Sequence, residues 1–480
     1  MHLADITSAL PELALVATAL ILLVMESATR PHRDLLAPVA LAGLGLALIA
    51  NLSSSSNGAF FSGMLQLNAF TRYLSTLFMV VTAAAIVVAI PYLKRTLEER
   101  GEYYSLMLFA AVGMNFMVKA QDLTMLFLGL ELLSIPLYIL AGFYRNHSQS
   151  NEAGLKYLLL GAFSTGFFLF GIALLYGSTG STAYELMADS IRTGADLSRM
   201  LTLAGFGLIL IGLGFKVALV PFHMYAPDVY DGAPTAITAF LSTGPKIAGF
   251  TALLMLLTVV FSGSMAHLWK VLWVLSAVTM TVGNLSALRQ ENIKRMLAYS
   301  SVAHAGYLLM AILVTNYDSA FGMLYYLVVY SIATLAAFGM VSLLEHDDAE
   351  GVTMSRFDGL AGKSPVLGAM FAISMLSLAG FPPTAGFLGK FFIFNAALDA
   401  GYTLLVVIAV LNSLVSVYYY LRPIVGIYMR PADTATGEER ITIPRVVVPV
   451  LVLLVIVAIG AGIYPAPLVR LSAVAISAIL

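Results

Sequence analysis

The sequence predicts an all-α membrane protein that crosses the bilayer about fourteen times within one integral domain, residues 1–480. First, 60% of the 480 residues are hydrophobic and only 11% are charged, whereas soluble domains carry about 25% charged residues. Second, apolar runs of about 18 residues or more, long enough to cross ~30 Å of hydrocarbon, recur along the whole chain. Third, the polar connections between these runs are too short to hold a folded extramembrane domain.

The predicted spans follow directly from these apolar runs. They cover residues 9–26, 35–52, 71–91, 103–118, 122–142, 155–177, 200–222, 232–260, 270–288, 293–314, 320–344, 364–398, 402–421 and 446–464. The first run has no Lys or Arg before it, so we interpret it as a spanning helix and not as a cleaved signal. Lys and Arg concentrate in the odd-numbered connections, which predicts that both termini lie outside the cytoplasm.

Composition excludes several classes of chemistry. The chain has no cysteine, which excludes disulfides, thiolate metal sites and Cys-ligated iron–sulfur clusters. Neither GxGxxG nor GxxxxGK[ST] follows a strand and opens a helix, so no nucleotide-binding loop is expected. The net charge of −1 gives no indication of nucleic-acid binding. We therefore expect no cofactor in this chain, and any redox or ATP chemistry must lie in other proteins.

Four charged residues lie well inside the predicted spans: Glu131, Lys216, Lys246 and Lys390. A charge at the centre of a membrane helix costs about 2.5–3.5 kcal/mol. Four such charges cost roughly 10–14 kcal/mol, which is comparable to the whole stability of a typical fold, about 5–15 kcal/mol. These side chains must therefore face the interior of the bundle, water or each other.

Two interpretations of these charges are open. They could form buried ion pairs that only position helices, or they could form a path for protons or ions. One carboxylate cannot neutralise three lysines, and burial disfavours the charged form of a lysine. We therefore favour a path in which buried lysines release and regain protons.

Each of the four charges lies close to a proline. Pro221 and Pro245 accompany the first two lysines, Pro382 and Pro383 precede the third, and Pro136 follows the glutamate. Proline removes a helical hydrogen bond, so we expect the helices to break at these positions. Broken helices beside charges are how transporters build sites at the membrane midplane, although a single proline is also compatible with an ordinary kink.

Three further basic residues are candidates: His304 belongs to the main path, and His223 and Lys156 are secondary. His304 lies near the middle of a span, where a histidine either packs through hydrogen bonds or relays protons, and we favour the relay. His223 lies seven residues after Lys216, which would place both on one helix face without the intervening proline. Lys156 is either an anchor at the membrane surface or a second basic group. We interpret the polar segment 220–236 as an exposed loop, with the structured mouth of a proton path as the alternative.

Four stretches resemble a known family. They are LFLGLELLSIPLY, GLGFKVALVPFHMYAPDVYDGAP, NIKRMLAYSSVAHAGYLL and MLSLAGFPPTAGFLGKF. They look like the proton-translocating membrane subunits of respiratory complex I, which are related to large subunits of multi-subunit Na⁺/H⁺ antiporters. Within the family the chain is most similar to subunit N of bacterial NADH-quinone oxidoreductases.

The resemblance implies an architecture of two inverted five-helix repeats, each with one discontinuous helix. The first repeat would cover about residues 103–260 and the second about 270–425. Three N-terminal helices would occupy about residues 1–102, and a C-terminal helix about 443–480. The sequence interruptions at Pro221 and at Pro382–Pro383 match the two discontinuous helices.

The resemblance also implies roles for the charged residues. Glu131 would pair with Lys216 and modulate its affinity for a proton. Lys246 would connect the two repeats, His304 would relay protons along the central axis, and Lys390 would carry them to the exit. NADH, FMN, iron–sulfur clusters and quinone would be bound by partner subunits.

The same resemblance implies an obligate hetero-oligomer in a bacterial inner membrane, with both termini on the periplasmic side. Other membrane subunits would flank the chain on both sides, and lipids would cover the rest. Two alternatives stay open. The chain could belong to a cation/proton antiporter that needs no redox partner, or it could be a scaffold that pumps nothing.

Overall fold

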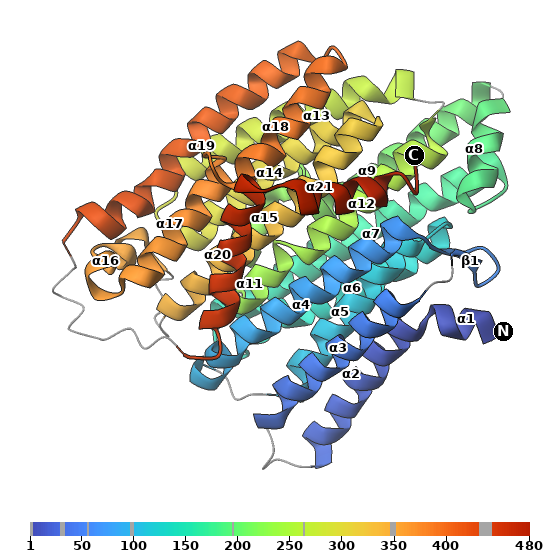
Figure 1. The fold of residues 1–480 in the computed structure, drawn as a ribbon. Helices are drawn as coiled ribbons and strands as arrows, with labels where there is room; N and C mark the ends of the chain where they lie inside the picture. Colours follow the sequence, from blue (N-terminus) through green and yellow to red (C-terminus); the bar gives the residue numbers. More distant parts are fainter. Residues whose placement is uncertain are drawn as a thin grey trace.

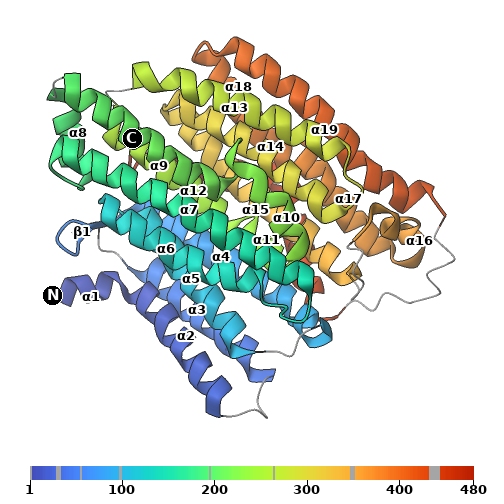
Figure 2. The same ribbon diagram turned by 180° about the vertical axis from the view of Figure 1, so that it is seen from behind.

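A computed structural model of the chain describes residues 3–28, 34–54, 57–96, 100–193, 196–262, 265–345, 352–431 and 444–480. Long helices run side by side through these residues in one bundle (Figures 1 and 2). The uninterrupted long helices are α2 (Leu10–Ala28), α3 (Leu36–Ser53), α4 (Ala69–Thr96), α5 (Gly101–Lys119), α6 (Leu123–Ala141), α7 (Ser148–Thr179), α13 (Met265–Leu288), α14 (Ile293–Val314), α15 (Tyr317–Leu344) and α19 (Thr403–Met429).

Short elements lie at the two ends of the bundle. Helix α1 (Leu3–Ser8), the hairpin of β1 (Gly58–Phe60) and β2 (Leu65–Leu67), and α8 (Tyr184–Thr193) lie toward one end, and α16 (Leu360–Lys363) lies at the other (Figure 1). The hairpin is tied to the bundle because the backbone N–H of Gln121 donates to the carbonyl of Met64. The described polar segments between the spans therefore lie at the two ends of the bundle.

The all-helical membrane fold is confirmed. Among the described residues, eleven segments are long and apolar enough to cross a membrane, or twelve if a bent C-terminal pair is counted as one span. The other predicted spans correspond to α5 and to the shorter helices α17 (Pro365–Ala379) and α18 (Ala385–Asp399). A helix therefore lies at every predicted segment, while the number of actual crossings stays a prediction.

The first interrupted helix consists of α9 (Asp196–Val217), a short 3-10 turn at Phe222–Met224, and α10 (Tyr225–Gly232). Ala218 begins the interruption in the left-handed region with φ 61°, and the Val220–Pro221 peptide bond is cis. The backbone N–H of Val220 donates to Thr279 Oγ1 on α13 at 3.1 Å. The helix thus ends where Pro221 removes a backbone donor.

The interpretation of residues 220–236 as an exposed loop is wrong. The segment contains the second half of the interrupted helix, and Tyr225, Val229 and Tyr230 are buried in the bundle. Sequence reasoning failed here because the segment is rich in proline and aspartate, whereas its apolar residues pack on helices that are distant in the sequence.

The second interrupted helix consists of α17 and α18. The chain leaves α17 at Gly380, which adopts φ 82°, and the Pro382–Pro383 peptide bond is cis. The C-terminal helix α20 (Val448–Ile463) packs directly on this interruption. A Cβ on Gly462 would lie only 2.0 Å from the carbonyl oxygen of Pro383, so only glycine permits this approach.

The other two prolines behave differently from each other. Helices α11 (Thr235–Leu241) and α12 (Gly244–Met255) are separated by Ser242 and Thr243, and Pro245 stands in the first turn of α12. Proline is tolerated in a first helical turn because its missing N–H has no partner there. Pro136, in contrast, lies inside α6, which stays helical through it. The predicted break beside Glu131 is therefore wrong, since neighbours in a membrane bundle can accommodate a proline.

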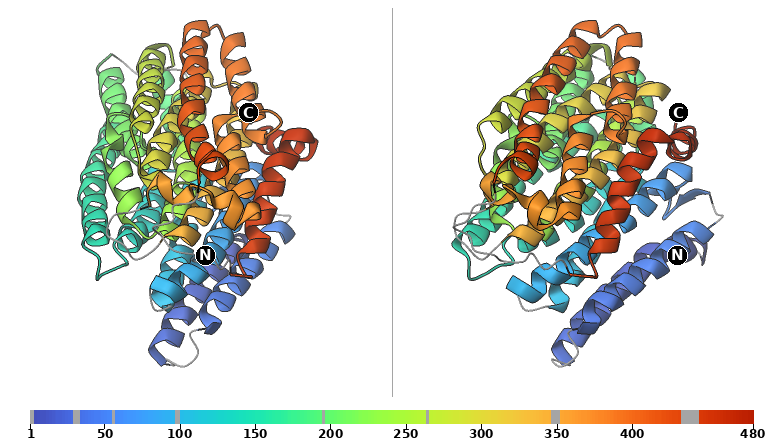
Figure 3. Two further views of the ribbon diagram at one scale, coloured as in Figure 1. Left: turned by 90° about the vertical axis from the view of Figure 1, so that its left-hand side faces the viewer. Right: turned by 60° about the vertical axis from the view of Figure 1, so that its left-hand side comes forward.

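The two chain ends pack on the bundle in different ways. Helix α20 bends by 84° into α21 (Ala466–Ile476), which lies across α4 and α15 (Figure 1). Helices α2 and α3 form one edge of the bundle (Figure 3). There, Lys119 at the end of α5 pairs with Glu12 on α2 at 2.6 Å, and both side chains are buried. Sequence analysis missed this pair because it placed Lys119 in a connection between spans.

We predict that the Glu12–Lys119 pair fastens α2 to α5. Lys119→Met leaves a buried carboxylate without its partner, which we expect to destabilise the chain by about 3–5 kcal/mol. Thermal denaturation of the purified complex, read out through this chain, measures the loss. The double variant Glu12→Leu with Lys119→Met removes both charges, so it should recover most of the stability. Equal stability of the single variant and the native chain would contradict a fastening role.

Candidate functional site

The three intramembrane lysines are buried, and each lies close to an interruption of a helix. Lys216 stands in the last turn of α9, Lys246 in the first turn of α12, and Lys390 in the first half of α18. None of their side chains is more than 4% exposed. Glu131 lies on α6 and is half-buried. The positions that sequence analysis singled out thus converge on the interior of the bundle.

Lys216 is held by neutral groups. Its ammonium donates to Ser134 Oγ on α6 at 2.8 Å. The rings of Tyr138 and Tyr157 lie near it, with their centroids 6.0 and 5.8 Å from Nζ. Such a distance allows a cation–π attraction. Because a hydroxyl and not a carboxylate binds this ammonium, Lys216 can lose its proton without breaking an ion pair.

Glu131 has a separate partner. Its Oε1 accepts a hydrogen bond from Thr165 Oγ1 on α7 at 2.8 Å. Among the ion pairs of the described residues, none joins Glu131 to Lys216, although Ser134, which binds Lys216, lies about one helical turn after Glu131 on α6. In this structure the two charges are neighbours that bind different hydroxyl groups.

Lys246 reaches across to α14. Its ammonium donates to the backbone carbonyl of Ser301 at 2.5 Å. The Ser301 hydroxyl in turn accepts a hydrogen bond from Tyr330 of α15 at 2.9 Å. Lys246 therefore touches the helix that also carries His304, three residues further along.

His304 is bonded at both ring nitrogens. Its Nδ1 is hydrogen-bonded to the hydroxyl of Tyr326 on α15, and its Nε2 to that of Tyr420 on α19 at 2.9 Å. Tyr420 also bonds the Ser300 hydroxyl. An imidazole between two hydroxyl groups can accept a proton at one nitrogen and release one at the other.

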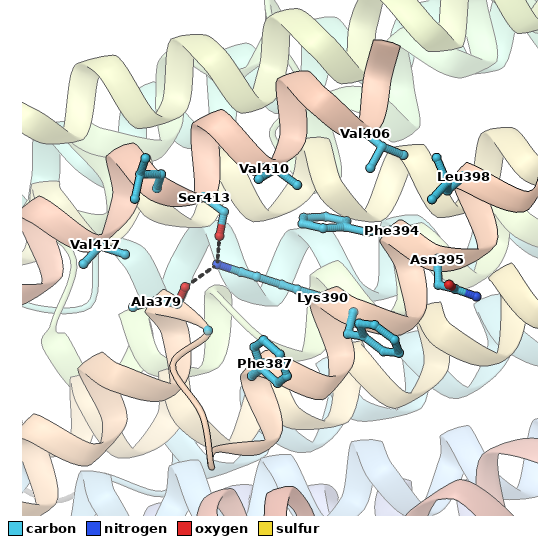
Figure 4. A pocket seen from close by; sticks show the side chains of 13 residues that line it. Ala379, Phe387, Lys390, Phe394, Asn395, Leu398, Val406, Val410, Ser413 and Val417 are labelled. Atoms are coloured by element: carbon cyan, nitrogen blue, oxygen red, sulfur yellow. Dashed lines mark hydrogen bonds between the residues drawn. The ribbon is translucent and has the colours of Figure 1, made fainter. Parts of the chain in front are cut away.

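Lys390 lies at the interruption between α17 and α18. Figure 4 shows its side chain reaching toward Ala379 and Ser413. The ammonium donates to the Ala379 carbonyl at 2.8 Å and to Ser413 Oγ on α19 at 3.2 Å. The Ala379 carbonyl is free to accept because α17 ends there. Tyr307 of α14 lies 5.3 Å from the ammonium, measured to its ring centroid.

A cavity of about 460 Å³ opens beside Lys390, between α18 and α19. Apolar side chains line most of it, including Phe387, Phe394 and Val410, as Figure 4 shows. Lys390 is the charged residue of this lining. The ammonium of Lys390 therefore lies at the edge of a mostly apolar space.

The two secondary candidates lie away from the ammonium groups. His223 falls in the 3-10 turn after the interruption, and its buried Nδ1 has no hydrogen-bond partner in the described part of the chain. Lys156 on α7 binds Glu152 and Asp228, each at 2.7 Å. Asp228 also binds Arg295 of α14 at 2.9 Å. Lys156 therefore belongs to a cluster of ion pairs at the end of α10, around a hollow of about 110 Å³.

Sequence analysis missed the hydroxyl groups that join the charged residues. These are Ser134, Thr165, Tyr326, Tyr330, Ser413 and Tyr420. Serine, threonine and tyrosine are common in membrane helices, so their presence in the sequence carries no signal of its own. The one sign of such hydroxyl groups in the sequence was local, because Ser300 and Ser301 closely precede His304.

Comparisons with known proteins identify the family. A family model described as "NADH:quinone oxidoreductase/Mrp antiporter, TM" matches residues 120–416. The NADH-quinone oxidoreductase subunit N of Trichlorobacter lovleyi is 42% identical over 98% of this chain and 96% of its own length. The chain belongs to the NADH-quinone oxidoreductase subunit N family.

Solved structures agree with this assignment. A chain of respiratory complex I from Thermus thermophilus superposes with a TM-score of 0.83 and 34% identity, covering 96% of this chain and 99% of that one. A chain of the Mrp complex from a Dietzia species has a TM-score of 0.86 at 23% identity, covering 98% of this chain and 97% of that one. At that identity the second likeness shows the fold alone.

We predict that Gly161 on α7 is required for the position of Tyr138 beside Lys216. A Cβ on Gly161 would lie 2.1 Å from the Tyr138 hydroxyl, so Gly161→Ala must displace the ring. Such overpacking costs about 1–3 kcal/mol. Gly166→Ala is the matched control, because a Cβ there meets nothing within 4 Å. Thermal denaturation of the complex should show a loss for the first variant and none for the second.

Proposed function

We propose that the chain carries protons across the membrane as the antiporter-like subunit of an NADH:quinone oxidoreductase. Electron transfer from NADH to quinone would drive this movement from other subunits, which would hold the FMN, the iron–sulfur clusters and the quinone. The observation that carries the proposal is the set of three buried lysines, each bonded to uncharged oxygen atoms. Such amines can alternate between charged and neutral forms, which a proton carrier must do.

The family resemblance, together with the contacts along α14, suggests an order for the carriers. Lys216 begins the path beside Glu131, and Lys246 follows on α12. Ser301 and His304 continue it along α14, where the side chains face one direction because they are three residues apart. Tyr307 lies between His304 and Lys390, with its ring 5.9 Å from the imidazole. Lys390 then releases the proton toward the exit.

Glu131 would control the first carrier. A nearby carboxylate favours the charged form of a lysine, and its withdrawal favours release of the proton. A movement from a neighbouring subunit would change the separation of Glu131 and Lys216. Moving one charge against 100 mV costs about 2.3 kcal/mol, an amount that the gain or loss of a buried ion pair can supply.

Proton uptake would use the first interrupted helix. The ion-pair cluster of Lys156, Asp228 and Arg295 lies where α10 meets the predicted cytoplasmic side, and His223 lies between this cluster and Lys216 along the chain. The inverted repeats at about residues 103–260 and 270–425 would each supply one interruption. Both interruptions stand beside a lysine, which supports this division.

The family supports a proposal for the assembly. The chain would be one of several membrane subunits in a respiratory complex of the bacterial inner membrane, with partners on both flanks and both termini in the periplasm. Exposed apolar side chains cover α7 at one side of the bundle and α19 at another, as such contacts and the lipid require.

We expect Lys216→Met to reduce NADH-driven proton pumping by at least about tenfold, because the first carrier is lost. Inverted membrane vesicles with a pH-sensitive dye measure this directly, after assembly of the complex is confirmed. Lys270→Met is the control, since Lys270 is exposed on α13 and outside the path. Normal pumping by the Lys216 variant would contradict the proposal, and Na⁺-dependent transport without NADH would favour an antiporter.

We expect Tyr420→Phe to slow coupled turnover about fivefold. The change removes the hydroxyl that bonds both His304 and Ser300, and a hydrogen bond of this kind contributes about 1 kcal/mol. Tyr418→Phe changes an exposed tyrosine on the same helix and should leave turnover as it is. Rates of NADH oxidation and pumping in the same vesicles provide the comparison. Equal rates for both variants would exclude Tyr420 from the relay.

A further inference from the structure

Two hydroxyl groups stand at the first carrier, one for each charge. Ser134 lies three residues after Glu131 on α6, so the two side chains share one face of that helix. Lys216 donates to Ser134, while Thr165 of α7 donates to Glu131, each at 2.8 Å. The acid and the base therefore each bind a neutral partner, although the serine that binds Lys216 lies only one helical turn from Glu131 on α6.

We infer that Ser134 and Thr165 are positioning residues that hold Lys216 and Glu131 in a separated state from which the lysine can lose its proton. This inference rests on the proposed function, since it names what keeps the pair apart in that mechanism. The proton-carrying state and the paired state would differ by which oxygen atoms the two charges bind.

The chemistry of a hydroxyl group suits this role. A hydroxyl donates one hydrogen bond and accepts up to two, so it can bind either an ammonium or a carboxylate. Ser134 accepts from Lys216 and donates to the Leu130 carbonyl at 2.5 Å, which fixes the direction of its lone pairs. Hydrogen bonds to charged groups are stronger than those between neutral groups. The two hydroxyls can therefore compete with direct contact between the charges.

In this proposal, Glu131 is the carboxylic acid that pairs with Lys216. The ionisable groups facing Lys216 are Glu131 and Tyr138 from α6, Tyr157 from α7 and Tyr225 from α10. Helix α12 presents Gly249 to the aliphatic part of the lysine. The charged residue of α12, Lys246, donates to the Ser301 carbonyl on α14. If either hydroxyl is removed, Glu131 is therefore the charged partner that the Lys216 ammonium can bind.

The test is Thr165→Val, an isosteric change that removes only the hydroxyl, together with Ser134→Ala. Both are measured in the assembled complex by NADH-driven proton pumping in inverted vesicles over a range of pH. We expect each variant to lower pumping near neutral pH by about tenfold, because the ion pair closes and retains the proton. Pumping should recover at higher pH, since a lower proton concentration favours release from the closed pair.

Two control variants separate positioning from packing. Thr165→Ser keeps the hydroxyl and should restore most of the pumping and the native pH profile. Ser164→Ala removes the neighbouring hydroxyl on α7, which bonds the Gly212 carbonyl at 3.4 Å and touches neither charge. Its profile should match that of the native chain.

The outcomes distinguish this inference from the proposed function. A native pH profile in Thr165→Val and Ser134→Ala, with pumping lost in Lys216→Met, would overturn the positioning role and leave the proton path in place. An equal, pH-independent loss in Thr165→Val and Thr165→Ser would mean packing alone, which also overturns it. Normal pumping in Lys216→Met would overturn the proposed function and the inference together.

Discussion

The structure depends on how a buried amine finds hydrogen-bond partners where water is scarce. A regular helix offers few, because most of its carbonyl groups are already bonded within it. The interruptions change this, since a helix that ends leaves carbonyl groups free. Lys390 binds such a carbonyl, that of Ala379, across the gap between α17 and α18. The broken helices therefore both interrupt the bundle and make a buried lysine tolerable.

Helix α14 acts as the axis on which the rest of the polar interior is arranged. Ser300, Ser301, His304 and Tyr307 recur at helical spacing along its buried face. Each contacts side chains from other helices, and these contacts place Lys246, Tyr330, Tyr420 and Lys390 around α14. A line of hydroxyl, imidazole and amine groups thus results from the packing of these helices.

Two kinds of buried lysine coexist in this chain, and their partners distinguish them. Lys119 is locked to Glu12 by a direct ion pair at the edge of the bundle, an arrangement that holds α2 on α5. Lys216, Lys246 and Lys390 are held by serine hydroxyls and backbone carbonyls. A full ion pair stabilises the charged state of a lysine, whereas neutral oxygen atoms leave the proton exchangeable. The same residue type thus fastens helices in one place and suits proton transfer in another.

The sequence by itself determined the membrane class, the positions of the spans, the interruptions at Pro221 and Pro382–Pro383, and the three central lysines. These follow from local physics, because hydrocarbon penalises charge and proline lacks a backbone donor. The tertiary structure alone decided that α6 continues through Pro136, that residues 225–232 are a buried helix, and that Lys119 meets Glu12. It alone placed Ser134 and Thr165 beside the first carrier. Each of these depends on contacts between helices distant in the sequence, which no local pattern encodes.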